Sequence, residues 1–194
     1  IKVVYSSSSS IYGNVTELPI TENALPRPYS PYGTTKLAGE HLCMLYNANY
    51  GIPVVSLRYF TVYGPRQRPD MAFHIFSKAL VQGKPITILG DGTQTRDFTY
   101  VDDIVDANIL AYQKDVSSAI VNLGGGCRIS INEVMNLLED IAGKKPEVIR
   151  KERFEGDVKD TWADTTQAQK ILGFMPKVDL KTGLAREYDW ARSL

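Results

Sequence analysis

Tyr32 and Lys36, in the segment YGTTK, are the residues whose types and spacing point most directly to chemistry. Side chains four residues apart on a helix share one face, with their Cβ atoms about 5–6 Å apart. A free tyrosine titrates near pH ~10 and is a poor base at neutral pH, but a neighbouring ammonium favours the phenolate. The pair could therefore act as a general base or acid. Tyrosine and lysine are also common on helix surfaces, so the motif alone leaves a surface role open.

Five consecutive serines, Ser6–Ser10, follow the apolar run Ile1–Tyr5 and precede Ile11-Tyr12-Gly13. A serine tract by itself is typical of a solvated linker. The preceding run predicts a buried strand, so the hydroxyls would stand at its carboxyl end, where ligands bind in open α/β sheets. The context favours a binding site over a linker.

The elements that must position these residues alternate between strands and helices. Strands are predicted at 1–5, 53–58, 86–89 and 119–123, and helices at 31–49, 71–82, 102–113, 131–142, 166–172 and 180–192. Ser130 and Glu133 form a capping box at the start of one of these helices. Such alternation predicts βαβ units and a parallel sheet.

The composition excludes several classes of protein. The 194 residues include 22 basic and 22 acidic side chains, and 43% are hydrophobic, enough to bury a core. This charge balance disfavours a nucleic-acid-binding surface, and no apolar run is long enough to span a membrane. Cys43 and Cys127 form no CxxC motif, so we interpret them as free thiols of a reducing cytoplasm. His41 and His74 lack the spacing of metal ligands, so no metal site is predicted.

Five segments together resemble the extended short-chain dehydrogenase/reductase superfamily, and within it the NAD-dependent nucleotide-sugar epimerases of the UDP-glucose and UDP-glucuronate 4-epimerase type. In chain order they are SSSSSIYG, SPYGTTK, LRYFTVYGP, GDGTQTRDFTYVDD and EGDVKDTWAD. The resemblance covers essentially the whole chain. It implies an α/β fold in which a Rossmann-like parallel sheet, present as its second half only, is joined to a smaller C-terminal α/β lobe that binds substrate.

The resemblance also implies a division of the chain. The remaining part of the dinucleotide-binding domain would be residues 1–62 and 98–123, and the nucleotide-sugar-binding lobe residues 63–97 and 124–194. The family's glycine-rich phosphate loop has no counterpart here, so we expect an N-terminal part to be missing and the fragment alone to be inactive. Many relatives carry an arginine where this chain has Phe154, and whether the adjacent Arg153 replaces it stays open.

Carried over position by position, the resemblance assigns the reaction to Ser8, Tyr32 and Lys36. Tyr32 matches the catalytic base, and Lys36 matches its partner, which also holds the nicotinamide ribose. Ser8 matches the residue that hydrogen-bonds the sugar hydroxyl. Because Tyr59 and Phe60 match the segment beside the nicotinamide, the implied NAD-binding residues are Tyr32, Lys36, Tyr59 and Phe60.

The substrate-binding residues implied by the resemblance are Ser8, Thr61, Arg68, Ile88, Arg96 and Asp157. Arg96 matches the arginine that binds the nucleotide diphosphate. Ile88 lies in the strand that usually lines the uracil pocket, and Asp157 matches a contact near the nucleotide.

The loop TVYGPRQRPDMA resembles the version found in UDP-glucuronate 4-epimerases. There the position of Arg68 meets the C6 carboxylate, and that of Thr61 lies beside the sugar. Arginine suits this role because its planar fork binds a carboxylate through two hydrogen bonds. The alternative is that Arg66 and Arg68 only solvate the loop, in which case UDP-glucose is the substrate.

The resemblance thus predicts an NAD-dependent enzyme that inverts C4 of UDP-glucose/UDP-galactose or UDP-glucuronate/UDP-galacturonate through a transient 4-keto sugar. The expected partners are the UDP-sugar and, in a complete protein, a second copy in a homodimer, with no nucleic acid and no membrane. One alternative is a non-catalytic nucleotide-sensing or scaffold protein on the same fold. Another is a nucleotide-sugar dehydratase or decarboxylase, but those relatives carry acidic residues where this chain has Ser9 and Ser10.

Overall fold

A parallel sheet carries the serine tract at the end of its first strand. The computed structural model describes residues 1–152 and 158–194. In this sheet β1 (Val3–Ser8) lies at one edge, β2 (Val54–Tyr59) in the centre and β6 (Ser118–Leu123) at the other edge. Both pairings are parallel, so Ser8 is level with Tyr59. The three carboxyl ends therefore form one edge, where a ligand can meet side chains from several strands.

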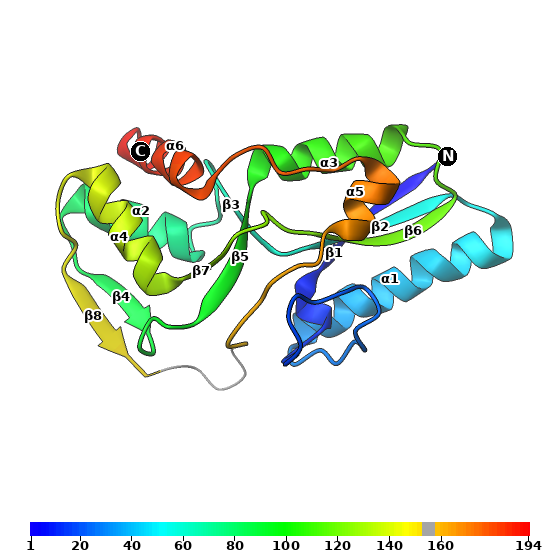
Figure 1. The fold of residues 1–194 in the computed structure, drawn as a ribbon, viewed down its shortest axis with the longest axis horizontal. Coiled ribbons are helices and arrows are strands. Elements are labelled where there is room, and N and C mark those ends of the chain that lie inside the picture. Colours follow the sequence, from blue (N-terminus) through cyan, green and yellow to red (C-terminus); the bar gives the residue numbers. More distant parts are fainter. Residues whose placement is uncertain (153–157) are drawn as a thin grey trace.

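Helices cover both faces of this sheet (Figure 1). α1 (Pro31–Tyr50) runs along one face, and α3 (Val101–Gln113) and α5 (Thr166–Leu172) lie on the other. Val55 and Leu57 of β2 belong to the core under α3 and α5. Because successive side chains of a strand point to opposite faces, the residues between them face α1.

The rest of the chain forms a second core with its own strands and helices, on the left in Figure 1. One sheet comprises β3 (Thr61–Tyr63), β5 (Thr95–Tyr100) and β7 (Arg128–Ser130). A separate pair of parallel strands is formed by β4 (Ile86–Leu89) and β8 (Val148–Lys151). The helices are α2 (Ala72–Gln82), α4 (Ile131–Ala142) and α6 (Leu180–Arg192). Tyr63, Phe73 and Phe98 pack at its centre, with ring centroids 4.3 Å apart for the two phenylalanines. Large aromatic side chains of this kind contribute strongly to core stability.

The predicted α/β class with parallel strands is confirmed, and every predicted helix and strand has a counterpart. The capping box also forms, with the Ser130 hydroxyl accepting from the Glu133 amide and the Glu133 carboxylate accepting from the Ser130 amide. The first strand differs from the prediction: its pairing with β2 continues through Ser8, and a short 3₁₀ turn, η1 (Ser9–Ile11), follows. Ser8 is therefore the last residue of a strand rather than part of a loop.

Four strands, β3, β5, β7 and β8, were not predicted. The strands β3, β7 and β8 are runs of three or four residues, which show too little alternation, and in β5 the charged residues Arg96 and Asp97 interrupt the apolar pattern. The division into two lobes stays a prediction. Within residues 1–152 and 158–194, no helix is long and apolar enough to cross a membrane.

Candidate active site

The first turn of α1 sets Tyr32 beside the end of β1. Ser30 caps the helix by accepting a hydrogen bond from the Gly33 amide at 3.1 Å, and Pro31 occupies the first helical position, where an N–H would lack a helical partner. Gly33 allows close approach, because a Cβ there would lie 2.5 Å from the Ser10 carbonyl oxygen. A larger residue at Gly33 would push the start of the helix away from the serine tract.

Lys36 lies one turn further along α1, between β1 and Tyr32. Its Nζ donates to the Ser6 carbonyl oxygen at 2.8 Å and lies 5.7 Å from the ring centroids of both Tyr32 and Tyr5. The Tyr5 hydroxyl donates to the Lys36 carbonyl oxygen at 3.1 Å. The helical spacing therefore does bring the ammonium to the phenol ring.

A cavity of about 540 Å³ opens at the carboxyl edge of the first sheet. Its walls come from the serine tract, the start of α1, the end of β2, β3 and the loop that follows β3. The lining residues are Ser7, Ser8, Ser9, Ser10, Tyr32, Tyr59, Phe60, Thr61, Val62, Arg66, Gln67, Arg68 and Met71. Most of the predicted catalytic, cofactor and sugar-binding residues thus share one cavity, and Lys36 adjoins it through Tyr32.

Ser8 and Tyr32, which both carry hydroxyl groups, line this cavity. Ser8 is 8% exposed, and its Oγ accepts a hydrogen bond from the Ser10 amide at 3.1 Å. Because that contact does not use the hydroxyl proton, Ser8 can still donate to a ligand. The Tyr32 side chain is 52% exposed, so a ligand can reach it.

Tyr59 and Phe60 form a wall of the cavity with little freedom to move. The Tyr59 hydroxyl donates to Asn108 Oδ1 at 2.9 Å and lies 3.0 Å from Ser6 Oγ. Phe60 is 3% exposed and packs against Tyr12, with ring centroids 6.5 Å apart. Side chains held in this way offer a rigid apolar surface to a planar ring.

A buried ion pair fastens α1 to the central strand beneath the cavity. Arg58 binds Glu40 through Nη2–Oε1 at 2.6 Å and Nε–Oε2 at 3.1 Å, and the two side chains are 5% and 1% exposed. Burial alone would raise the pKa of Glu40, but the hydrogen bonds and charge of Arg58 outweigh it and hold this pKa below its ordinary value. The pair fixes the helix that carries Tyr32.

Two further polar groups extend this buried pair toward β6. Arg58 donates to the Tyr12 hydroxyl at 2.7 Å, and that hydroxyl donates to Asn122 Oδ1 at 2.6 Å. Burial raises the pKa of Tyr12 to about 12, so the hydroxyl keeps the proton that it donates. A buried charge whose hydrogen bonds are satisfied in this way rigidifies its surroundings.

Arg68 lies in the loop on the other side of the cavity. Its guanidinium binds Asp70 through Nη2–Oδ2 at 2.9 Å and Nε–Oδ1 at 3.1 Å, and the side chains are 71% and 66% exposed. The hydrogen bond from Arg68 lowers the pKa of Asp70. Water screens the charges of an exposed pair, so this pair adds little to the stability of the fold, and a ligand carboxylate can replace Asp70 on the guanidinium.

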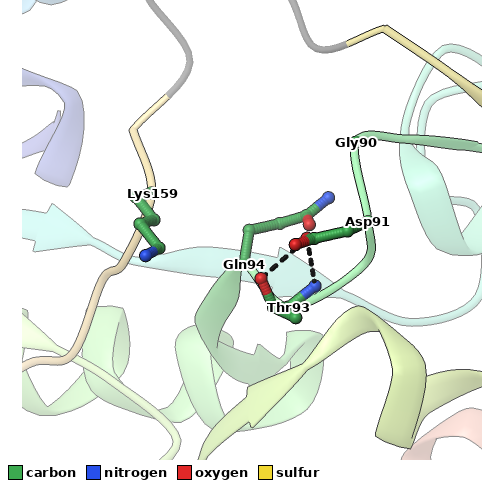
Figure 2. Close-up of a pocket in the computed structure, with 5 residues that line it drawn as sticks. All are labelled: Gly90, Asp91, Thr93, Gln94 and Lys159. Atoms are coloured by element: carbon green, nitrogen blue, oxygen red, sulfur yellow. Dashed lines mark hydrogen bonds between the residues drawn. The ribbon is translucent and has the colours of Figure 1, made fainter.

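A second cavity, of about 380 Å³, lies beside the turn between β4 and β5 (Figure 2). Gly90, Asp91, Thr93 and Gln94 line it from the turn, and Lys159 faces them across it. The Asp91 carboxylate accepts hydrogen bonds from the Thr93 amide at 2.9 Å and hydroxyl at 2.7 Å. These contacts fix the shape of the turn.

The residues predicted for the nucleotide are not brought together in one cavity of the described part. Arg96 donates to the carbonyl oxygens of Thr95 and Lys159, both at 2.9 Å, beside the second cavity. Ile88 is 2% exposed in the second core and lines a separate cavity of about 160 Å³. Asp157, together with Arg153 and Phe154, lies outside the described residues.

Several residues of the site carry little signal in the sequence. Gln67 and Met71 line the first cavity and Lys159 the second, and sequence reasoning gave none of them a role. The pair of Glu40 and Arg58 was also missed. A charged residue inside the apolar strand does indicate that a buried partner must exist, but not which residue it is.

Comparison with known protein families identifies the group to which the chain belongs. The model of the NAD dependent epimerase/dehydratase family matches residues 1–124. The chain belongs to this family. The matched range includes the serine tract, Tyr32, Lys36 and the first sheet, so the family match and the cavity geometry concern the same residues.

Two curated relatives of this epimerase/dehydratase chain carry the names of UDP-sugar epimerases. It is 46% identical over 192 residues to the uncharacterized UDP-glucose epimerase YtcB of Bacillus subtilis (strain 168). It is 43% identical over 192 residues to the UDP-glucuronate 4-epimerase of Thermodesulfobacterium geofontis (strain OPF15). The alignments cover 98% of this chain but 60% and 59% of the relatives. The chain thus spans about 60% of the length of these relatives.

Solved structures of family members superimpose closely on the chain. The UDP-glucuronic acid 4-epimerase from Bacillus cereus, in complex with UDP-glucuronic acid and NAD, gives a TM-score of 0.95 at 46% identity, covering 99% of this chain and 62% of that one. The UDP-glucose 4-epimerase from Thermotoga maritima, with UDP-glucose, gives 0.95 at 37% identity, covering 100% and 64%. These matches confirm the predicted family and the Rossmann-like fold.

Proposed function

We propose that the protein carrying this chain is an NAD-dependent UDP-sugar 4-epimerase. The observation that carries the proposal is that Ser8 and Tyr32 line one cavity at the carboxyl edge of a parallel sheet, with the Lys36 ammonium 5.7 Å from the Tyr32 ring centroid. Family membership and relatives named for UDP-sugar epimerases support it.

The residues around the cavity fit the nicotinamide end of NAD. Tyr59 and Phe60 supply a rigid aromatic wall, and the Lys36 ammonium has donor capacity beyond its bond to the Ser6 carbonyl oxygen. We assign Tyr32, Lys36, Tyr59 and Phe60 to this end of the cofactor. When bound, NAD supplies the acceptance and return of the C4 hydride.

In this proposal Tyr32 moves the proton at the sugar 4-oxygen. The Lys36 ammonium, 5.7 Å from the ring centroid, stabilises negative charge on the phenol, so Tyr32 can take the 4-hydroxyl proton and later return it. Ser8 donates a hydrogen bond to the same sugar oxygen and orients it. The sugar must turn over between the two proton transfers, and the cavity of about 540 Å³ leaves room for this rotation.

UDP-glucuronate is the proposed substrate. The observation in its favour is that Arg68 already holds a carboxylate, that of Asp70, through two hydrogen bonds at the cavity. Thr61 lines the same cavity and would lie beside the sugar. UDP-glucose is the second candidate, because the ion pair between Arg68 and Asp70 can also remain formed beside a sugar that has no charge at C6.

We assign the nucleotide end of the substrate to the neighbourhood of the second cavity. Arg96 borders it and would meet the diphosphate. The roles of Ile88 and Asp157 as nucleotide contacts rest on the family resemblance alone. Ser9 and Ser10 line the first cavity and cannot act as carboxylic acids, which argues against dehydration or decarboxylation.

A homodimer in the cytoplasm completes the proposal. The large apolar side chains of α1 that remain exposed could be covered by a second copy; they are Leu42, Leu45, Tyr46 and Tyr50. Cys43 and Cys127 are free thiols, which fits a reducing compartment.

The proposal is tested with the natural protein at its native length. It is incubated with NAD and, separately, UDP-glucuronate, UDP-glucose and UDP-N-acetylglucosamine, and the products are separated by chromatography. We expect conversion of UDP-glucuronate to its 4-epimer. Unchanged UDP-sugars in all three reactions would support the scaffold alternative, and a UDP-pentose or a 4-keto-6-deoxy sugar would point to decarboxylation or dehydration.

A further inference from the structure

The loop from Gly64 to Met71 contains an unusual backbone conformation next to the first cavity. Arg66 is the only residue other than glycine, within the described ranges, that has a positive φ, 69°. Side chains with a Cβ are strained in this conformation, and such strain persists only where the surroundings enforce it. Arg66 also lines the cavity that contains Ser8 and Tyr32.

In Gln67, the next residue, the backbone amide, the carbonyl oxygen and both polar atoms of the side chain all make hydrogen bonds. Its amide donates to the Gly64 carbonyl oxygen at 3.0 Å, and its side-chain nitrogen donates to the Val62 carbonyl oxygen at 2.9 Å. Its two oxygens both meet His74: the side-chain oxygen accepts from the His74 amide, and the carbonyl oxygen contacts His74 Nδ1, each at 3.0 Å.

His74 is built into the second core rather than into the cavity. It lies in the first turn of α2, is 6% exposed, and its ring meets Trp190 of α6 edge-on with centroids 5.3 Å apart. A carbonyl oxygen can only accept, so Nδ1 carries the ring proton that it donates to Gln67. Nε2 is buried and has no hydrogen-bond partner in the described part of the chain.

We infer that Gln67 and His74 form a clamp that positions Arg66 and Arg68 for substrate recognition. The clamp rests on the proposed function, because it assumes that the sugar of a UDP-sugar enters the first cavity. His74 is a positioning residue, since it acts on the loop and does not line the cavity. Ser8 and Tyr32 stand on other elements, so loosening the clamp weakens substrate binding and leaves the proton transfer intact.

The matched variants His74→Asn and His74→Gln test the clamp in the natural protein. Both remove the ring and its contact with Trp190, but the asparagine amide nitrogen stands where Nδ1 stands, whereas that of glutamine reaches the Nε2 position. We expect His74→Gln to raise KM for UDP-glucuronate roughly tenfold, the loss of about one hydrogen bond, with kcat within about twofold. His74→Asn should restore most of the affinity.

Equal KM values for the two variants, or a loss in kcat alone, would overturn the clamp. Gln67→Met removes the side-chain bonds to Val62 and His74 at nearly unchanged volume, and provides a second test if His74→Gln does not fold. It should raise KM by a similar factor and leave kcat near the wild-type value.

Hydrogen exchange separates the clamp from the proposed function. The amides of Gln67 and Met71 donate within the loop, and in His74→Gln they should exchange at least about tenfold faster than in His74→Asn. If the wild-type protein converts no UDP-sugar, the proposed function fails while this measurement still decides the clamp. Identical exchange in both variants would refute it.

Discussion

The two sides of the first cavity are built in different ways. Ser8, Tyr32 and Lys36 stand on a strand end and a helix, and the buried Arg58–Glu40 pair joins that helix to the sheet. The opposite side is a loop, held by side-chain hydrogen bonds. The difference indicates that the groups proposed for proton transfer are fixed by the fold itself. The groups proposed to recognise the sugar sit on a segment that can vary without disturbing them.

Each of the two sides of the cavity also has one buried glutamate, and the pKa values of these two carboxyl groups are shifted in opposite directions. Glu40 is paired with Arg58, and its pKa is lowered. Glu187 of α6 is fully buried and has no cation paired with it in the described ranges; burial raises its pKa to about 7, although the Gly64 amide lowers it in part. At neutral pH the charged Glu40, paired with Arg58, thus stabilises the side proposed for catalysis, which carries Ser8, Tyr32 and Lys36. On the side proposed for recognition, which carries the loop with Arg68, negative charge on the unpaired Glu187 is destabilising.

Tyr32→Phe should cause the largest change in activity. Removing the hydroxyl leaves the ring and the helix in place, so the natural protein should still bind NAD but lose ~10²–10⁴-fold in kcat for epimerisation, as for other acid–base groups. Tyr46→Phe, at another exposed tyrosine of α1, is the matched control and should retain full activity. Equal activities of the two variants would remove Tyr32 from the reaction.

Glu40→Gln should cause the largest change in stability. It leaves Arg58 buried without a countercharge, a loss of ~3–5 kcal/mol in the free energy of unfolding. Asp70→Asn, which breaks the exposed pair with Arg68, should change the free energy of unfolding far less, because both side chains stay in water. Urea unfolding at pH 7 measures both, and similar losses would show that burial does not distinguish the two pairs.

Glu187→Gln is expected to stabilise the protein at pH 8, by on the order of 2–3 kcal/mol. The folded-state pKa of Glu187, about 7, lies above the ordinary 4.5. The stability that the protonated carboxyl gives the wild-type protein is therefore fully present below pH 4.5 and is lost as the pH rises through 7. The difference in unfolding free energy between variant and wild type should therefore grow from pH 4.5 to pH 8. A difference independent of pH would show that burial does not perturb this carboxyl.

Arg68→Ala should give the smallest effect, on selectivity alone. A hydrogen bond to a charged group contributes ~1.5–3 kcal/mol, so kcat/KM for UDP-glucuronate should fall roughly tenfold to a hundredfold. The value for UDP-glucose should stay nearly unchanged. Equal losses on both substrates would remove the carboxylate role and favour UDP-glucose as the substrate.

The geometry of the side proposed for catalysis could be predicted from the sequence because its signals are local. The tyrosine–lysine spacing, the cap at Ser30 and the strand before the serine tract each lie within a few residues, and helical or strand periodicity converts them into positions in space. The length of β1 was underestimated, because serines carry no strand signal and only pairing with β2 extends the strand to Ser8.

The recognition side could not be predicted in the same way, because it depends on contacts across the chain. Gln67 meets His74 through an irregular loop, and β3 is too short to show a period. For Ile88, the strand was predicted correctly, and the role of its side chain stays a prediction. Because Ile86 and Ile88 both point into the second core, a match to a segment says nothing about which side chains reach a ligand.

The most direct test of the central claim follows the hydrogen at C4. The natural protein is incubated in ordinary water with NAD and UDP-glucuronate deuterated at C4, and both epimers are examined by NMR and mass spectrometry. Removal and return of the hydride within one cavity predicts an equilibrium mixture of epimers that retains the deuterium at C4. Loss of the deuterium to water, or no epimer at all, would contradict the proposed C4 epimerisation.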